Sequence, residues 1–475
     1  MKRVDLLDAA RLALLQRRLD ALLPDAPAHG LLSITLDLGM TRHDWLDLDV
    51  EKSEATYWAQ PGLASSRLAL GRAMIFSTTG TARFSALQAA FAGIALAWLH
   101  DDNEHTGVVP AAHIGFAFAE ESRDGWPNAR LVVPAILLQN RAGHSTATFS
   151  CAVRDSANAI ERWIDELRAM RISGDTAQVQ AGELQRRANP LADRAFLARS
   201  RVALSDIATG HLEKIVLTRS VRFDAAQAIA SAPLLAALTQ RHPECTIYAI
   251  GLDGQSLVGA TPESLVSLDN GVVRADALAG TAWLSAAPDS TRPGSLKLLD
   301  DKNSREQQLV VDAVRAALAP LCVSLAPPQK PEIMQLRELQ HLRTCITGKV
   351  RDDVGLFDLI ARLHPTPAVG GTPDTAARQW LHSHGDQRGA WYTGGIGWID
   401  RNGNGEIAVA LRCARIAGTQ AELYAGAGIV AGSDPAQELA ETEVKLGAMI
   451  AALHHAQALG NPACVRSESS KTGTP

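Results

Sequence analysis

Segments with the composition of β-strands are distributed along almost the whole chain, and this distribution most constrains the fold. In the first 150 residues, apolar and β-branched runs separated by turns predict strands near residues 31–39, 73–80, 113–119 and 131–139. After a helix expected at about 192–209, strands and helices alternate to about residue 456 with few recognisable βαβ units. Many strands without βαβ connections favour an α+β fold over a doubly wound parallel sheet.

The composition is that of a large globular protein, and it excludes several functional classes. The chain has 475 residues and a formal net charge of −5, so it can bury a core without disulfide or metal staples. The charge is too small for a polyanion partner to be expected, and no basic patch with interleaved aromatic residues points to nucleic acid. The six cysteines have neither CxxC nor zinc spacing, which indicates reduced thiols.

The expected cellular location and oligomeric state rest on apolar segments that the sequence does not contain. The N-terminal helical pattern lacks the uncharged core of a signal peptide, and the apolar run from Phe84 to Leu99 is short for a membrane span. We therefore expect a cytoplasmic protein without a membrane partner. No long exposed apolar stripe indicates an oligomer, so a monomer is expected.

The segment 425–445 joins a glycine-rich run to a helix with charges on one face. Asp434 is a natural N-cap, and Pro435 suits the first helical position. Three charged side chains then follow at i, i+3 and i+7 on a face that borders the apolar stripe: Glu438, Glu441 and Lys445. Two carboxylates and a cation near backbone N–H groups suit a metal ion and an anionic ligand. A solvated, salt-bridged helix face is the alternative.

Two other segments supply a candidate base and a candidate acid. Lys214 opens the strand-like run KIVLTR, where desolvation would favour the neutral amine, which could act as a base. A solvated lysine at a strand end is the alternative. The turn GATPE presents the carboxyl group of Glu263, which in an apolar setting would keep its proton and could serve as a general acid.

Two charged residues lie within apolar patterns and therefore need partners. Glu306 precedes two apolar helix positions by three and four residues, so it points to the buried side of its helix. A divalent cation or an arginine could pair with it there. Arg412 follows the NGNG hairpin turn at 402–405, within the second predicted strand. A buried arginine is costly unless a carboxylate of the protein or of a ligand pairs with it.

The motifs HLRT and HPTPAVGG contribute a histidine each. Prolines and paired glycines make 364–371 a rigid loop that a ligand could approach closely. No second histidine stands at metal-ligand spacing from His341 or His364, so both are expected to be hydrogen-bonding structural residues.

The order of these motifs along the chain is specific. Ten blocks between about Phe196 and Leu453 together resemble the chorismate-utilising enzymes: KIVLTR, GATPE, LAGT, REQQLV, HLRT, HPTPAVGG, GGIGW, VALRCA, YAGAGIV and SDPAQELAETEVK. TYWAQPG at 56–62 matches more loosely. The resemblance implies a large α+β fold in which antiparallel-rich β-sheets pack as a sandwich core with helices outside.

The same resemblance divides the chain into four parts. Residues 191–456 would form the chorismate-binding catalytic region, and residues 1–172 a variable N-terminal part of the same fold. Residues 173–190 are polar and without period, which predicts a surface linker. Residues 457–475 have the composition of a disordered tail.

Within the family the pattern is most similar to that of isochorismate synthases. Lys214 stands where enzymes that add water at C2 of chorismate carry lysine, whereas ammonia-using anthranilate synthases typically have glutamine. The resemblance implies a reversible conversion of chorismate to isochorismate, with Lys214 as the base that activates water. Glu263 would be the acid that protonates the departing C4 hydroxyl.

The resemblance also implies a metal site and a substrate site. Mg²⁺ would be held by Glu306 and Glu441, with help from Glu438, and would bind the ring carboxylate of chorismate. Such a site agrees with the preference of Mg²⁺ for a few carboxylates. The substrate would be bound by five residues: Thr281, His341, Arg412, Lys445 and the backbone N–H of Gly428.

Three alternative functions remain at this point. A salicylate synthase would share the lysine base and then eliminate pyruvate from isochorismate. An anthranilate or aminodeoxychorismate synthase fits Lys214 poorly and would need a glutaminase subunit, which we do not expect. A non-catalytic chorismate-binding subunit would need neither base nor acid. Menaquinone, siderophore and salicylate synthesis are all compatible destinations for the product.

The chain departs from the family pattern at two positions. Gln307 stands where the family often has histidine, and Cys345 replaces a proline. Neither is a predicted catalytic group, so both departures concern loop geometry and not the chemistry.

Overall fold

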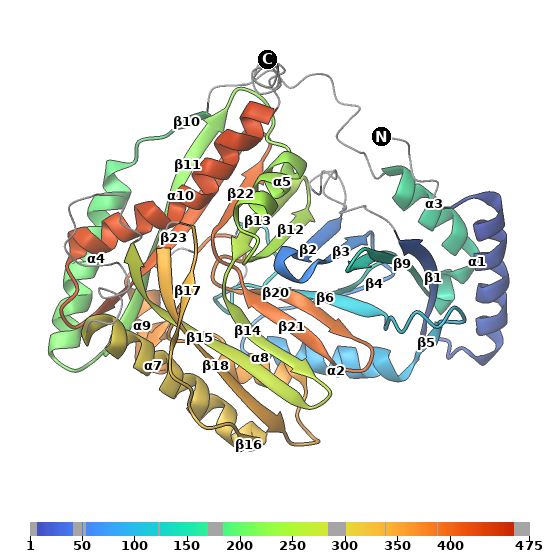
Figure 1. Ribbon diagram of the computed structural model, residues 1–475, viewed down its shortest axis with the longest axis horizontal. Helices are drawn as coiled ribbons and strands as arrows, with labels where there is room; N and C mark the ends of the chain where they lie inside the picture. Colours follow the sequence, from blue (N-terminus) through green and yellow to red (C-terminus); the bar gives the residue numbers. More distant parts are fainter. Residues whose placement is uncertain are drawn as a thin grey trace, which may run out of the picture.

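Two large β-sheets form the body of the protein (Figure 1). The structure is a computed structural model that describes residues 7–40, 50, 54–121, 124–169, 184–283, 301–337, 339–386 and 388–459. Among the described strands, one neighbouring pair, β1 with β5, is parallel and the others are antiparallel. The expected α+β class with antiparallel-rich sheets is confirmed.

Within the described ranges, the first sheet contains thirteen strands. In spatial order these are β10 (Leu184–Arg186), β11 (Lys214–Ala225), β23 (Gln420–Val430), β22 (Cys413–Ala417), β13 (Gln255–Thr261), β12 (Thr246–Leu252), β2 (Ala55–Gln60), β3 (Ser65–Leu70), β8 (Ile136–Arg141), β9 (His144–Ala152), β1 (Leu31–Met40) and β5 (Trp98–Asp101). The short strand β19 (Gly371–Thr372) pairs with β11 beside this path.

The second sheet has ten strands in the part of the chain that the structure describes. In spatial order these are β16 (Cys322–Leu325), β18 (Leu339–Val350), β15 (Val272–Trp283), β14 (Ser264–Asp269), β21 (Gly405–Val409), β20 (Gly395–Asp400), β6 (Ala111–Phe116), β7 (Ala129–Val133) and β4 (Met74–Thr78). Strand β17 (Glu332–Gln335) pairs with β18 beside this path.

Helices cover the outer faces of both sheets. They are α1 (Ala9–Leu22), α2 (Arg83–Leu96), α3 (Ala159–Ala169), α4 (Pro190–Ala208), α5 (Ser231–Arg241), α7 (Asp301–Leu318), α8 (Leu356–Leu363), α9 (Asp374–Ser383) and α10 (Pro435–Leu459). Helices α4, α5 and α10 pack on the first sheet, and α2, α7 and α8 on the second. No helix of the described ranges is long and apolar enough to cross a membrane.

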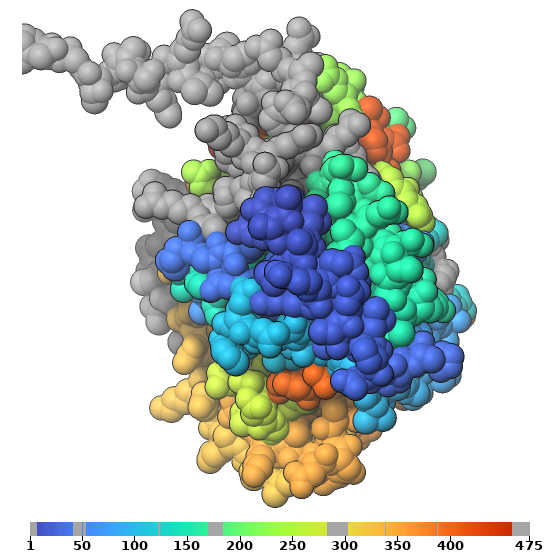
Figure 2. All heavy atoms as spheres, turned by 90° about the vertical axis from the view of Figure 1, so that its right-hand side faces the viewer, coloured from blue at the N-terminus to red at the C-terminus, as the bar shows by residue number. Residues whose placement is uncertain are grey.

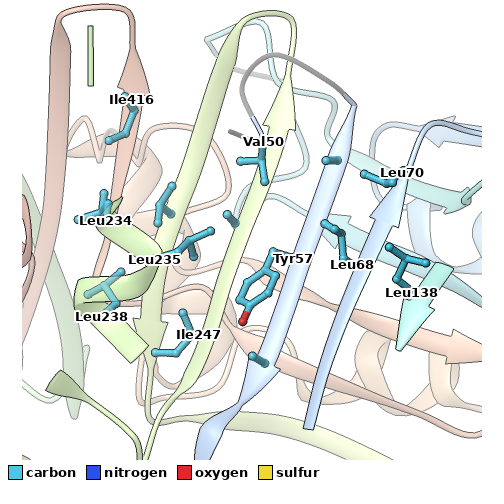
Figure 3. Packing of buried hydrophobic residues seen from close by; sticks show 14 of the residues in the cluster. Val50, Tyr57, Leu68, Leu70, Leu138, Leu234, Leu235, Leu238, Ile247 and Ile416 are labelled. Atoms are coloured by element: carbon cyan, nitrogen blue, oxygen red, sulfur yellow. The ribbon is translucent and has the colours of Figure 1, made fainter. Parts of the chain in front are cut away.

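The three largest apolar clusters among the described residues hold the layers together. One lies between the first sheet and its helices, where Leu234 and Leu238 of α5 face Ile247 of β12 and Tyr57 of β2 (Figure 3). A second fills the space between the second sheet and helices α2, α7 and α8. The third contains side chains from both sheets, among them Trp58, so it lies between them. Burial of this apolar surface is the main stabilising contribution to the sandwich.

The N-terminal part of the chain belongs to the same sheets as the rest. Strand β2 pairs with β12 in the first sheet, and β6 pairs with β20 in the second, so both sheets continue across the two parts. Helices α1 and α3, in blue and green-blue, cover the N-terminal end of the molecule (Figure 2). The N-terminal third is therefore a structural part of one fold.

The structure differs from two expectations about strands and the linker. The apolar run at 131–139 is two strands, β7 and β8, which belong to different sheets and are separated at Pro134. Proline cannot donate to a ladder, which explains the break. The end of the expected linker, Leu184–Arg186, is strand β10, because its backbone pairs with β11. Residues 170–183 and 460–475 lie outside the described residues, and helix α10 continues to Leu459.

Candidate active site

The predicted site residues come together where the strands near one edge of each sheet meet two helices. Strands β11 and β23 belong to the first sheet, β15 and β18 to the second, and α7 and α10 lie beside them (Figure 1). All of these elements lie in the left-hand part of Figure 1, away from the N-terminal helices α1 and α3. The site is thus built from the region 191–456.

Lys214 and Glu306 form an ion pair at the centre of this region. Lys214 is the first residue of β11, is 1% exposed, and its Nζ lies 2.8 Å from Glu306 Oε1 on α7. Gly428 of β23 makes room for the pair, since a Cβ there would lie 2.5 Å from Glu306 Oε1 and 3.1 Å from Lys214 Cε. The ammonium and carboxylate compensate each other's desolvation, which explains how a lysine is buried here.

Glu263 is a buried acid that holds its proton at neutral pH. It lies between β13 and β14, is 4% exposed, and its Oε1 has no hydrogen-bond partner among the described residues. Burial, followed by the negative charge of Asp276, raises the pKa of Glu263 to about 8, against the opposing effects of Lys214, Lys445 and Arg412. A protonated carboxyl group can donate a proton, which is the property that the predicted role of a general acid requires.

His341 and Arg412 form a directional pair. His341 Nδ1 lies 3.2 Å from the Gly280 carbonyl oxygen, and Nε2 lies 3.1 Å from Arg412 Nη2. Since a carbonyl and a guanidinium fix the two roles, Nδ1–H donates to Gly280 and Nε2 accepts from Arg412. Burial and the charge of Arg412 lower the pKa of His341 to about 3, so the ring is neutral. His341 thereby orients one edge of the guanidinium.

Thr281 lies next to this pair on a bulge of β15. The register with β18 shifts between Ala279 and Thr281, and Gly280 has φ +69°, which glycine adopts readily. The Thr281 hydroxyl lies 3.3 Å from His341 Nδ1, and its N–H donates to Asn303 Oδ1 at 3.0 Å. The bulge therefore directs Thr281 and His341 to the same place.

Helix α10 brings its charged face to the site. Asp434 Oδ1 accepts from the backbone N–H groups of Ala436 and Gln437, both at 2.9 Å, so the predicted N-cap is confirmed. Lys445 Nζ lies 2.6 Å from Glu441 Oε1 and donates to the Gly426 carbonyl oxygen at 2.9 Å.

Glu438 faces inward on the same helix. It is 1% exposed, whereas the side chain of Glu441 is 16% exposed. The α10 face is therefore partly buried, so the alternative of a solvated face is wrong, although the salt bridge that this alternative expected is present between Lys445 and Glu441.

The three glutamates of the site are the predicted ligands of Mg²⁺. Glu306, Glu438 and Glu441 offer only hard oxygen donors, which suit Mg²⁺. Glu306 and Glu441 are each paired with a lysine, and among the described residues no three His, Cys, Asp or Glu side chains form a group that could hold a metal ion. An ion bound by these glutamates would have to replace the two ammonium groups as their partners.

Arg412 is not part of a strand, contrary to the expectation from alternation. Strand β21 ends at Val409, and β22 begins at Cys413 in the other sheet. Arg412 has φ +49°, in the left-handed region. The chain turns between the sheets at this residue, and the alternation of a single strand could not reveal that turn.

Several residues that support the site were not predicted. Asn303 fixes the bulge at Thr281, and Gln307 donates from α7 to the Ala277 carbonyl oxygen and to the Thr344 hydroxyl, both at 3.0 Å. Gln307 therefore ties α7 to β15 and β18, although it departs from the family pattern. Arg388 donates to the carbonyl oxygens of Val369 and Val216, which joins the HPTPAVGG loop to β11. Such residues are identified only by contacts between segments that lie far apart in the sequence.

Comparison with known proteins agrees with this geometry. Residues 24–454 match the family described as chorismate binding enzyme. The chain is 31% identical over 411 residues to isochorismate synthase MenF of Bacillus subtilis (strain 168), which covers 84% of this chain and 87% of the relative. It is 36% identical over 284 residues to the salicylate biosynthesis isochorismate synthase of Pseudomonas aeruginosa, covering 60% of this chain and 58% of the relative.

Solved structures give the same result. The structure of MenF, the menaquinone-specific isochorismate synthase from Escherichia coli, has a TM-score of 0.76 and 25% identity, and the match covers 94% of this chain and 99% of that one. Anthranilate synthase component I from Streptococcus pneumoniae shares the fold, with a TM-score of 0.63 and 19% identity over 81% of this chain and 92% of that one. The chain therefore belongs to the family of chorismate-binding enzymes.

Proposed function

We propose that the protein is an isochorismate synthase, which interconverts chorismate and isochorismate with Mg²⁺ as cofactor. The observation that carries this proposal is a buried, protonated Glu263 that lies near enough to the buried Lys214 for the charge of Lys214 to affect its pKa, within the chorismate-binding family. The reaction needs an acid and a base at once. Relatives that are named isochorismate synthases support the same activity.

The chemistry is an exchange of hydroxyl groups with an allylic shift. Lys214 removes a proton from a water molecule, and the water oxygen forms a bond to C2 of chorismate. Both ring double bonds shift by one position, from C1=C2 and C5=C6 to C1=C6 and C4=C5, as the bond from C4 to its hydroxyl breaks, and Glu263 gives the leaving oxygen its proton. One water enters and one leaves, so the reaction is an isomerisation. Each acid–base contribution is worth roughly 10²–10⁴-fold in rate.

The charged residues of the site would orient the substrate. Arg412, oriented by His341, and Lys445 would pair with the carboxylates of chorismate, and Thr281 and the Gly428 N–H would add hydrogen bonds. Glu306, Glu438 and Glu441 would hold Mg²⁺, which would bind a substrate carboxylate and neutralise its charge.

The test is an incubation of the purified protein with chorismate and Mg²⁺, with separation of the products by chromatography. We expect isochorismate in equilibrium with chorismate, and no turnover after EDTA treatment. Salicylate and pyruvate as the main products would assign the chain to the lyase branch. No turnover, with or without ammonia, would contradict the enzyme assignment and favour a binding subunit.

A further inference from the structure

Asn303 of helix α7 is a buried polar residue that takes no part in the proposed acid–base chemistry. It is 7% exposed and precedes Glu306 by three positions, so the two side chains lie on the same face of the helix. A buried side-chain amide is costly unless it is hydrogen-bonded. Asn303 Oδ1 accepts the backbone N–H of Thr281 on β15 at 3.0 Å. This bond attaches the helix to the strand at one defined peptide unit.

The Thr281 N–H belongs to the same peptide unit as the Gly280 carbonyl group. This unit is planar and trans, so its N–H and C=O point in opposite directions, and a bond that fixes one of them also fixes the other. It lies at the bulge, where the pairing of β15 with β18 is irregular. Gly280 allows close approach of the helix, since a Cβ there would lie 3.2 Å from Asn303 Cβ and from the Asn303 carbonyl oxygen. Asn303 therefore holds the Gly280 carbonyl in its direction.

The Gly280 carbonyl orients His341, and His341 orients Arg412. His341 Nδ1–H donates to this carbonyl oxygen at 3.2 Å, and His341 Nε2 accepts from Arg412 Nη2 at 3.1 Å. In the described part of the chain, His341 is the only side chain that is hydrogen-bonded to Arg412, and no carboxylate forms an ion pair with it. The direction of the guanidinium thus depends on a series of hydrogen bonds that begins at Asn303.

We propose that Asn303 is a positioning residue for the substrate: it fixes the Gly280–Thr281 peptide plane, and through His341 it directs Arg412 toward a carboxylate of chorismate. The inference rests on the proposed function, in which Arg412 binds that carboxylate. A guanidinium that is already held in its bound direction loses less conformational freedom when the carboxylate binds, so the affinity is higher. Because Glu306 lies on the same face of α7, one helix face aligns the ion pair with Lys214 and the carboxylate-binding group.

The experiment measures chorismate binding in variants of Asn303. Asn303→Leu keeps the approximate shape of the side chain and removes the acceptor, so the affinity should fall about three- to tenfold. Calorimetric titration in the Lys214→Gln background, where turnover does not disturb the heats, gives the affinity. Steady-state kinetics in the wild-type background should show a rise in KM by a similar factor with little change in kcat, because the bond to the carboxylate is made before and during the reaction. Ser304→Ala, at the exposed next position of α7, is the control and should bind as wild type does.

A double-mutant cycle with His341→Phe separates positioning from a structural role. This substitution keeps a ring and removes both nitrogens, so the series of bonds is already broken. Asn303→Leu should then change the affinity by less than about twofold. Asn303→Asp keeps an acceptor oxygen, so its effect should be the same with His341 and with Phe at position 341. Asn303→Ala, which favours the helix, repeats the cycle if the leucine variant does not fold.

The outcomes distinguish this inference from the proposed function. Unchanged affinity in Asn303→Leu and Asn303→Ala, or an equal loss with and without His341, would show that Asn303 does not act through His341 and would overturn the inference. If the protein binds chorismate but forms no isochorismate, the proposed function is wrong, and the same titrations still decide the role of Asn303. Absence of chorismate binding in the wild type would overturn both.

Discussion

Glu263 and Arg412 lie at two neighbouring crossings of the chain from one sheet to the other. Glu263 follows β13 and precedes β14, and Arg412 lies between β21 and β22. Strands β13 and β22 pair in the first sheet, and β14 and β21 pair in the second. Ala260 N–H donates to the Arg412 carbonyl oxygen at 3.2 Å, and Val409 N–H donates to the Glu263 carbonyl oxygen at 3.1 Å. The acid and the guanidinium are therefore held together by backbone that both sheets anchor.

Removal of the amine of Lys214 should abolish turnover and leave chorismate binding largely intact. Both Lys214→Ala and Lys214→Gln should reduce kcat by about 10²–10⁴-fold, because neither side chain can accept a proton from water. Glutamine can still donate to Glu306, so this variant protects the fold against an unpaired buried carboxylate. Steady-state kinetics and equilibrium binding of chorismate provide the measurement. Lys349→Ala, an exposed lysine of β18, is the control, and near-normal turnover in Lys214→Gln would remove Lys214 as the base.

Activity should fall as the pH rises through about 8, since Glu263 must carry a proton to act as the acid and its pKa is about 8. The measurement is kcat/KM from pH 6 to 10, which reports the free enzyme. In Asp276→Asn the falling limb should move to lower pH, because the negative charge of Asp276 contributes to the raised pKa of Glu263. A limb that stays in place in Asp276→Asn would contradict this electrostatic coupling.

The stability of the protein should depend on the same proton. Glu263 has a pKa of about 8 in the fold and 4.5 as its ordinary value, so between these pH values the native state binds the proton that the unfolded chain has lost. Stability is therefore lost as the pH rises from 4.5 to 8, by up to about 1.4 kcal/mol per pH unit. Glu263→Gln has no titrating group at this position, so its free energy of unfolding should exceed that of wild type. This difference should grow as the pH rises to 8.

Urea unfolding at several pH values between 4.5 and 8.5 measures this difference. Glu161→Gln, an exposed carboxylate at the start of α3, is the matched control. If the difference between Glu263→Gln and wild type stays constant with pH, Glu263 is not buried in the protonated form.

Gly428→Ala should reduce activity without unfolding the protein. The added Cβ would lie 2.5 Å from Glu306 Oε1, so the carboxylate must move away from Lys214. We expect kcat to fall about tenfold or more, because small displacements of catalytic groups are costly. Gly93→Ala in α2 is the control, since a Cβ there meets no atom within 4 Å, and it should stabilise the helix by about 0.5–1 kcal/mol. Equal kinetics of the two variants would show that the ion pair tolerates displacement.

Glu441→Ala should weaken Mg²⁺ binding and activity together. Magnesium titration of turnover, and direct calorimetric binding of Mg²⁺, would measure both effects. The matched control is Glu443→Ala on the same helix, because Glu443 pairs with Arg186 at 2.6 Å and also with Arg219, away from the site lysine. Unchanged Mg²⁺ affinity in Glu441→Ala would remove this residue as a ligand.

Much of the site could be identified from local patterns. The start of α10 at Pro435 follows from the N-cap of Asp434, and the inward direction of Glu306 follows from helical periodicity. The α+β class follows from many strands without βαβ connections. Each of these conclusions depends on residues close together in the sequence, where propensity and spacing act directly.

Tertiary structure alone decided how these residues act together. The sequence by itself determined which acids, bases and cations the chain carries and which helices and strands present them. It could not place Arg412 at a crossing between sheets, nor bring Asp276 close enough to raise the pKa of Glu263. Strand pairing and burial depend on contacts between distant segments, and these contacts set the local electrostatics that turn an ordinary glutamate into an acid with a pKa near 8.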